Sequence, residues 1–229
     1  MTNTEILNQI KGGLIVSCQA LESEPLYSSY IMGRMAFAAK EGGAVGIRAN
    51  TVADITEIKK TVDLPVIGII KAVYGDNPVY ITPTEKEVEA LMGTGVEIIA
   101  IDATDRQRPD GVSLDVFFKK VREKYPAQLF MADCSCFEDC AHAAEIGFDL
   151  VGTTLCGYTE KTKGTPIPSY SLLERITTEL QVPVIAEGGV WERDQLKKVF
   201  SYPVHAAVVG TAITRPRDIT RRFVEAIQK

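Results

Sequence analysis

The stretch PVIGIIK, residues 65–71, decides the fold class of this 229-residue chain. After the proline it is a continuous apolar run, without alternation of apolar and polar residues, which is typical of a parallel strand covered on both faces. The run ends in Lys71, and an ammonium group beside a buried strand is unfavourable unless it is paired or neutralised. The presence of Lys71 there needs a reason, which the rest of the chain supplies.

Seven further segments have the same short, apolar character. They are LIVSCQ at 14–19, AVGIRAN at 44–50, EIIAIDAT at 97–104, LFMADCS at 129–135, LVGTTL at 150–155, PVIAEGGV at 183–190 and AAVVGTAIT at 206–214. Segments with helical periodicity lie between them, at 30–43, 53–62, 83–95, 113–125, 136–147 and 170–181. Strand and helix therefore alternate along the chain.

This alternation predicts an α/β protein with one (β/α)₈ TIM barrel, a single domain over residues 1–229. A doubly wound open sheet is the structural alternative. A doubly wound sheet that binds a dinucleotide carries a glycine fingerprint directly after its first strand. In this chain the residues there are CQAL, at 18–21, without glycine. No linker or break in composition divides the chain.

Charge and composition exclude several classes of protein. A net charge of −5 gives no electrostatic footprint for nucleic acid. The four arginines of RPRDITRRFVEAIQK, at the C-terminus, have the amphipathic spacing of a solvated helix face, although Arg215 is kept as a site candidate. No apolar stretch is long enough to span a membrane and the N-terminus lacks the pattern of a signal peptide, so we expect a cytoplasmic protein.

Five cysteines, an odd number, fit a reducing compartment better than a disulfide framework. Cys134, Cys136 and Cys140 lie close together in ADCSCFEDC, but no second paired motif or suitably spaced histidine completes a zinc site. Small buried thiols are the favoured interpretation, and no metal is expected.

A polar residue ends each predicted strand, where the loops of such a barrel build the active site. A single polar residue at a strand end commonly marks only the place where the chain reaches solvent. Here the opposite ends of the strands carry apolar residues, so polar residues gather at one end of the barrel only. The strand-end residues are Gln19, Arg48, Lys71, Asp102, Asp133, Thr153 with Thr154, Glu187 and Thr211.

The last two strands end in glycine-bearing loops, AEGGV at 186–190 and GTAIT at 210–214. Loops at this place in a barrel commonly present backbone N–H groups to a phosphate. Arg215 can add a charge-assisted hydrogen bond. The alternative is that Gly188 and Gly189 merely turn the chain.

Several motifs together resemble the N-acetylmannosamine-6-phosphate 2-epimerase family, of the NanE type. They run in order along nearly the whole chain: GGLIVSCQALESEPL, AVGIRAN, IGIIKAVYGDNPVYITPT, IIAIDAT, ADCS, GTTLCGYT and VIAEGGV. The long motif around Lys71 is specific, whereas the glycine motifs occur in many phosphate-binding barrels. The resemblance implies an epimerase that inverts C2 of an N-acyl hexosamine 6-phosphate in sialic acid catabolism, without a cofactor, as a homodimer.

The resemblance also assigns roles to residues. Lys71 and Glu187 would be catalytic. The sugar would be held by Gln19, Arg48, Asp133 and Thr153, and the phosphate by Gly189, Gly210, Thr211 and Arg215. To these we add Asp102 for the sugar and Gly188 for the phosphate.

Inversion beside a masked aldehyde requires a base, an acid and a stabiliser of the enolate oxygen. Lys71 and Glu187 would lie on opposite walls of an eight-stranded ring, which suits two bases, but a single-base mechanism through Lys71 stays open. The protonation state of Lys71 is also open, because burial and Arg48 lower its pKa while the carboxylates raise it.

Three other functions remain as alternatives. Another phosphosugar barrel, such as an isomerase, a decarboxylase or an aldolase that forms a Schiff base on Lys71, is the first. A flavin-binding barrel would use similar glycine loops, and a sensor that binds a sugar phosphate without turnover belongs to a different class of protein.

Overall fold

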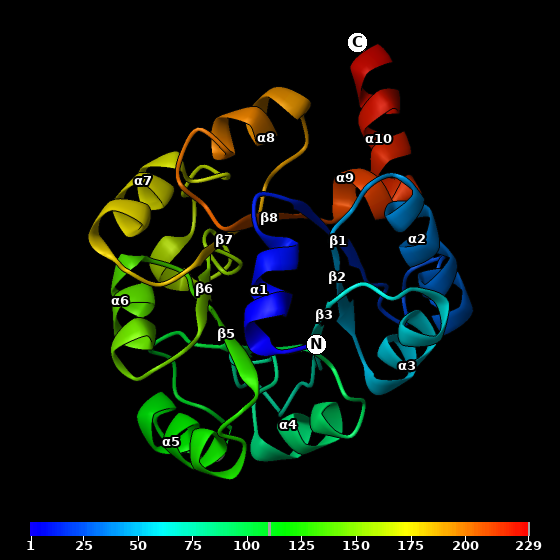
Figure 1. Cartoon of the computed structure of the whole chain (residues 1–229). Coiled ribbons are helices and arrows are strands. Elements are labelled where there is room, and N and C mark those ends of the chain that lie inside the picture. The colour runs from blue at the N-terminus through cyan, green and yellow to red at the C-terminus, as the bar shows by residue number, and fades with distance from the viewer. Residues whose placement is uncertain (110, 229) are drawn as a thin grey trace.

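The predicted (β/α)₈ barrel is confirmed by a computed structural model that describes residues 1–109 and 111–228. Eight parallel strands pair in chain order, and β1 closes the ring by pairing with β8. Figure 1 shows the helices surrounding this ring. The strands are β1 (Leu14–Cys18), β2 (Gly46–Asn50), β3 (Val66–Ile69), β4 (Ile98–Asp102), β5 (Leu129–Asp133), β6 (Leu150–Gly152), β7 (Val184–Glu187) and β8 (Ala206–Val209).

The helices follow the strands in chain order; in addition, one helix precedes β1, a 3₁₀ helix lies between β6 and its α-helix, and two helices follow β8. They are α1 (Asn3–Ile10), α2 (Ser29–Glu41), α3 (Val52–Thr61), α4 (Glu85–Met92), α5 (Leu114–Lys124), α6 (Phe137–Glu145), the short 3₁₀ helix η1 (Glu160–Thr162), α7 (Tyr170–Glu179), α8 (Arg193–Val199), α9 (Thr211–Thr214) and α10 (Pro216–Ile227).

The continuous apolar strands supply two layers of core at once. In β4, Ile98 and Ala100 belong to the cluster that fills the barrel, whereas Ile99 and Ile101 belong to the layer between strands and helices. Successive side chains of a strand point to opposite faces, so both layers need apolar residues. This is why the runs do not alternate.

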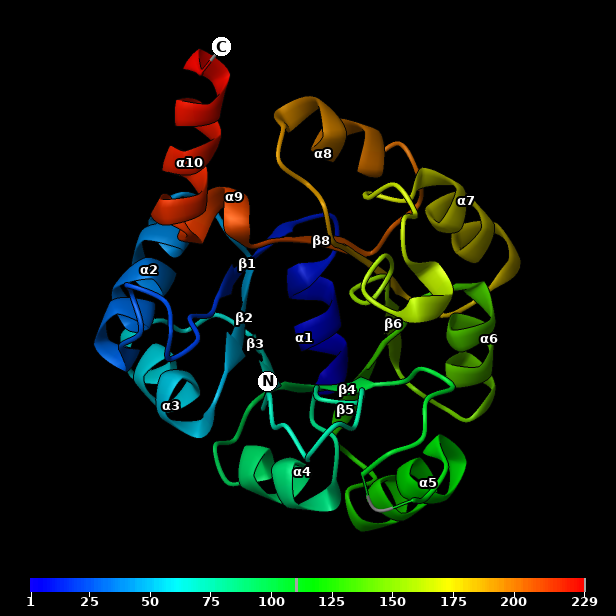
Figure 2. The same ribbon diagram turned by 180° about the vertical axis from the view of Figure 1, so that it is seen from behind.

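No helix is predicted before β1, yet residues 3–10 form α1. Thr2 and Glu5 make a capping box, in which Thr2 Oγ1 accepts the Glu5 N–H and the Glu5 carboxylate accepts the Thr2 N–H. Ile6 and Ile10 join the apolar cluster inside the barrel. Both views show α1 in line with the centre of the ring, so it closes the end opposite to the strands' C-termini (Figures 1 and 2).

The segment TAIT, 211–214, is predicted as the end of a strand but forms the short helix α9. Gly210 ends the extended backbone, and Thr214 turns back to donate from its hydroxyl to the Ser17 carbonyl at 2.8 Å. The change of direction brings Arg215 back toward β1.

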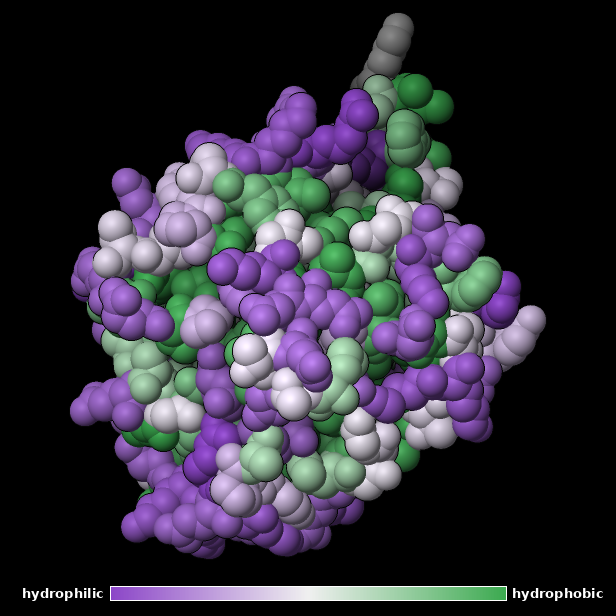
Figure 3. Space-filling view, in the orientation of Figure 1, coloured by the Kyte–Doolittle hydropathy of each residue, from purple (hydrophilic) through white to green (hydrophobic). Residues whose placement is uncertain are grey.

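The predicted C-terminal amphipathic helix is α10, and it has no buried residue. In Figures 1 and 2 it projects beyond the ring of helices. Figure 3 shows hydrophobic residues gathered on it. Phe223 is 74% exposed and Ile227 is 81% exposed.

Candidate active site

A cavity of about 450 Å³ opens at the C-terminal ends of the strands. Nine of the predicted site residues line it: Gln19, Arg48, Lys71, Glu187, Gly188, Gly189, Gly210, Thr211 and Arg215. Gln19 is buried, and its side-chain amide donates to Ser17 Oγ at 2.9 Å. Residues far apart in the sequence meet here because every parallel strand delivers its end to the same rim.

Arg48 holds two carboxylates at the floor of this cavity. Its Nη1 and Nη2 donate to Asp133 at 3.1 and 2.6 Å, and Nη1 also lies 3.2 Å from Glu187 Oε2. Burial alone would lower the pKa of Arg48, but the charges of Asp133 and Glu187 raise it on balance. The buried Nε of Arg48 has no hydrogen-bond partner among the described residues, which leaves one donor of this guanidinium unused.

Lys71 lies just beyond β3, in a loop that folds back on itself. Its backbone N–H donates to Asn50 Oδ1 at 2.9 Å, and Lys71 pairs with Ile81 in an isolated antiparallel bridge. Among the described residues no carboxylate comes within ion-pair distance of its ammonium group. Burial, then the charges of Arg48 and Arg215, lowers the pKa of Lys71 to about 8. The site therefore holds an amine that loses its proton near neutral pH.

Glu187 ends β7 and faces the cavity with both acidic and basic neighbours. Burial and the charge of Asp133 raise its pKa, against the opposing effects of Arg48, Thr154 and Lys71. The Thr154 hydroxyl lies 2.6 Å from Asp133 Oδ1 and 3.2 Å from Glu187 Oε2. Glu187 is thus a carboxyl group that holds a proton more tightly than an ordinary glutamate.

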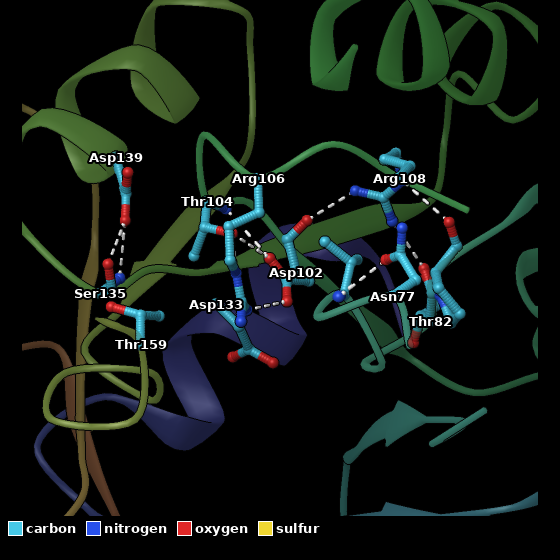
Figure 4. Close-up of polar contacts among 12 residues, drawn as sticks. Asn77, Thr82, Asp102, Thr104, Arg106, Arg108, Asp133, Ser135, Asp139 and Thr159 are labelled. Carbon is cyan, nitrogen blue, oxygen red and sulfur yellow. Dashed lines mark hydrogen bonds and ion pairs between the residues drawn. The ribbon is translucent and has the colours of Figure 1, made fainter. Parts of the chain in front are cut away.

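Three predicted sugar-binding residues do not line the cavity. Asp133 is fully buried under Arg48. Thr153 is bonded to the Glu187 backbone, donating to its carbonyl at 2.8 Å and accepting its N–H at 3.0 Å. Asp102 accepts from Thr104 and Arg106, as Figure 4 shows. Each of these three side chains is hydrogen-bonded to other groups of the protein.

The predicted phosphate end of the cavity is formed by the loops after β7 and β8. Gly188 and Gly189 have φ values of +112° and +73°, which favour glycine. A Cβ on Gly189 would lie 2.5 Å from the backbone of Ile167. Only glycine lets the loop after β7 approach the loop after β6, which carries Ile167, so closely.

Other lining residues are not in the predicted set. Thr154 lines the cavity where Thr153 does not; β6 ends at Gly152, so strand alternation could not choose between them. Tyr80, Tyr158 and Trp191 come from loops whose path the sequence pattern does not fix. Tyr74, from the same loop as Tyr80, does not line the cavity and donates to Glu87 at 2.8 Å.

The described residues contain no group of three or more His, Cys, Asp or Glu side chains placed to hold a metal ion. All five cysteines are free, and four of them are buried. In the described part of the chain, no helix is both long and apolar enough to cross a membrane.

Comparison with known proteins identifies relatives over nearly the full length. The NanE family, described as "Putative N-acetylmannosamine-6-phosphate epimerase", matches residues 32–229. A Clostridioides difficile (strain 630) protein named "Putative N-acetylmannosamine-6-phosphate 2-epimerase" is 56% identical over 223 residues, 97% of this chain and 99% of the relative. A protein of the same name from Borreliella afzelii (strain PKo) is 53% identical over 227 residues, 98% of each chain.

Two solved structures extend the comparison. The N-acetylmannosamine-6-phosphate 2-epimerase from Clostridium perfringens is 49% identical, with a TM-score of 0.93 over 97% of this chain and 96% of that one. A thiamine phosphate pyrophosphorylase from Pyrococcus furiosus, 18% identical with a TM-score of 0.62, covers 98% of this chain and 100% of its own and shares the fold alone. The chain belongs to the N-acetylmannosamine-6-phosphate epimerase family.

Proposed function

We propose that this protein interconverts N-acetylmannosamine 6-phosphate and N-acetylglucosamine 6-phosphate by inverting C2. The observation that carries the proposal is one cavity lined by an amine of lowered pKa, a carboxyl group of raised pKa and a glycine-rich end next to Arg215. Family membership supports the same reaction. The acceptance of a sugar phosphate follows from the glycine loops and Arg215, which suit a phosphate group.

In the proposed mechanism the sugar ring opens and the neutral Lys71 amine removes the C2 proton. The electron pair of the C2–H bond forms a C1–C2 double bond, and negative charge develops on the C1 oxygen. Arg48 lines the cavity and keeps its proton, so its positive charge can stabilise this enolate oxygen. The phosphate subsite anchors the far end of the substrate and so positions C2.

Glu187 then donates its proton to the opposite face of C2. The residue ends β7 while Lys71 follows β3, so the two approach the substrate from opposite walls of the ring. The pKa directions support these roles, because a lowered amine pKa favours the base and a raised carboxyl pKa favours the acid. A proton must afterwards pass from Lys71 to Glu187 through solvent to restore the enzyme.

The experiment that tests this function is proton NMR of purified protein with N-acetylmannosamine 6-phosphate in heavy water, without added metal. We expect N-acetylglucosamine 6-phosphate to accumulate with deuterium at C2. Absence of turnover would overturn the proposed function. Turnover with full retention of the C2 hydrogen would overturn the two-base mechanism and favour a shielded single base.

An aldolase is the second candidate, because an amine with a pKa of about 8 also suits attack on a carbonyl carbon. Borohydride reduction in the presence of substrate separates the two functions. A reduced adduct on Lys71, seen by mass spectrometry, would favour the aldolase, whereas unmodified Lys71 with continued epimerisation supports the epimerase.

We further propose a homodimer that acts in the cytoplasm on amino sugar phosphates released during sialic acid breakdown. A phosphorylated sugar is a charged molecule that does not diffuse across membranes, which supports the location. The exposed apolar side chains of α10 support association of two copies. The reaction as written transfers only a proton, so it requires no redox cofactor.

A further inference from the structure

The β1–α2 loop carries a carboxylate, that of Glu24, which binds the guanidinium of Arg215 on the side away from the main cavity. Glu24 Oε1 lies 2.9 Å from Arg215 Nε, and Arg215 Nη2 donates to Glu24 Oε2 at 3.1 Å. Two parallel bonds of this kind fix the plane of an arginine as well as its position. The Glu24 side chain is only 10% exposed, so water competes weakly for these bonds.

Glu24 is itself held from several sides. The Leu21 N–H donates to its Oε2 at 2.8 Å, and Arg217 Nη2 lies 3.3 Å from its Oε1. The Glu24 backbone N–H also donates to the Leu21 carbonyl at 2.8 Å, which closes a turn. The carboxylate is therefore a fixed point on which Arg215 is aligned.

The bonds to Glu24 leave the other edge of Arg215 for a ligand. Side-on contact uses Nε and one hydrogen of Nη2, and Nη1 donates one hydrogen to the hydroxyl of Thr211 at 3.3 Å. Thr211 lines the cavity together with Arg215. One Nη1 hydrogen and one Nη2 hydrogen remain, and two such parallel N–H groups match the spacing of two phosphate oxygens.

Glu24 does not line the main cavity. It lines a neighbouring cavity of about 280 Å³, whereas Gln19, Thr214 and Arg215 line both. Arg215 thus forms part of the wall between the two spaces, with Glu24 behind it. Glu24 therefore has no direct contact with a substrate in the main cavity: its bonds reach that space through Arg215, and its charge opposes the lowering of the Lys71 pKa.

We infer that Glu24 is a positioning residue that orients Arg215 for the phosphate group of the substrate. This inference rests on the proposed function. Arg215, Arg217 and Arg221 are linked by ion pairs to Glu24 and Asp218, so this cluster of five side chains keeps a net positive charge. The Glu24 carboxylate therefore does not cancel the attraction for a phosphate dianion. Without Glu24 the long Arg215 side chain would sample several rotamers, and phosphate binding would have to restrict them.

Glu24→Gln tests the inference, with Glu22→Gln as the matched control. Glu22 lies in the same loop and is exposed, so both variants lose one negative charge. For Glu24→Gln we expect KM for N-acetylmannosamine 6-phosphate to rise roughly tenfold, the size of effect expected for a weakened charged hydrogen bond. The inhibition constant of inorganic phosphate should rise in parallel, while kcat stays within about threefold. Glu22→Gln should change none of these.

An unchanged or lower KM and phosphate inhibition constant in Glu24→Gln would overturn the inference, since a lower value would mean that Glu24 only repels phosphate. If Glu24→Gln fails to fold, Glu24→Asp keeps the charge but shortens the reach by one methylene, and KM should rise in the same way. If the wild-type protein does not turn over the substrate, the proposed function fails. The role of Glu24 can then still be tested, by measuring the binding of inorganic phosphate to wild type and Glu24→Gln by calorimetry. Equal phosphate affinity in wild type and variant, or no phosphate binding to either, would overturn the inference there.

Discussion

At the scale of single residues, Lys71 is the clearest case in which the fold changes the chemistry of a side chain. Burial and two neighbouring arginines lower its pKa to about 8, against the opposing charges of Glu187 and Glu24. The site therefore contains a base whose uncharged form is accessible near neutral pH. Two predictions follow from this residue and its partner Glu187.

The first concerns replacement of Lys71. Lys71→Met should lower kcat about 10³-fold, within the range for loss of a general base. Because the folded pKa of about 8 lies below the ordinary value of 10.5, the protonated amine destabilises the fold below pH 8, and this penalty fades as pH rises toward 10.5. At pH 7 Lys71→Met should therefore raise the free energy of unfolding by at most about 3 kcal/mol.

Chemical denaturation and steady-state kinetics check both parts. Lys60→Met, an exposed lysine on α3, is the control and should change neither quantity appreciably. Near-normal activity in Lys71→Met would remove the amine from the mechanism, and a loss of stability would contradict the burial penalty.

The second concerns the pH dependence of kcat/KM. With a neutral Lys71 as base and a protonated Glu187 as acid, the two side chains of the active enzyme together hold one proton. Above about pH 8 this proton is lost, so activity should fall. A single-base mechanism through Lys71 requires only the neutral amine, so activity would rise through pH 8 to a plateau. Initial rates from pH 6 to 10 distinguish the two mechanisms.

At the scale of elements, the loop after β7 depends on a contact that no local pattern reveals. Gly189 has positive φ and lies against Ile167, which comes from the loop after β6. Gly188 also has positive φ, but a Cβ there would meet only the Thr153 carbonyl oxygen at 3.8 Å. The two glycines share backbone strain but differ in available space.

Gly189→Ala should therefore weaken the phosphate subsite more than Gly188→Ala. We expect Gly189→Ala to destabilise the protein by about 1–3 kcal/mol, the range for backbone strain and overpacking. It should also raise KM for the sugar phosphate. Thermal unfolding and kinetics of both variants give the comparison, and equal effects would show that backbone strain alone is responsible.

At the scale of the whole molecule, α10 leaves the barrel instead of packing on it. None of its residues is buried, and Phe223, Val224 and Ile227 are exposed by 74%, 42% and 81%. An amphipathic helix with an uncovered apolar face is unfavourable for an isolated molecule in water. This arrangement supports the proposed homodimer.

Phe223→Ser combined with Ile227→Ser should shift the protein from dimer to monomer, because polar side chains remove the apolar area that drives association. Arg221→Ser combined with Glu225→Ser makes two matched polar changes on the opposite face of α10 and should leave the dimer intact. Sedimentation equilibrium measures the mass of each variant. A monomeric wild type, or a dimer unaffected by the first pair, would contradict the proposal.

The sequence by itself determined the barrel and the place of its active site. Eight continuous apolar runs cannot lie at a surface, and alternation with helices leaves few topologies other than a closed parallel ring, as β1 pairing with β8 confirms. A polar residue at the end of each run then necessarily lies on one rim. The capping box of Thr2 and Glu5 was also readable, and with Ile6 and Ile10 it could have indicated α1.

Only the tertiary structure decided which of those polar residues face the cavity and in what state. Asp133 and Thr153 end strands as Lys71 and Glu187 do, yet contacts with β2 and β7 engage their side chains. Asp102 is engaged instead by Thr104 and Arg106, from the loop that follows its own strand. Local pattern fixes a residue's place along its own strand, but burial and charge depend on neighbours distant in sequence. For the same reason, neither the lowered pKa of Lys71 nor the ion pair of Glu24 with Arg215 could be predicted from the sequence, because each depends on residues that the closed ring brings together.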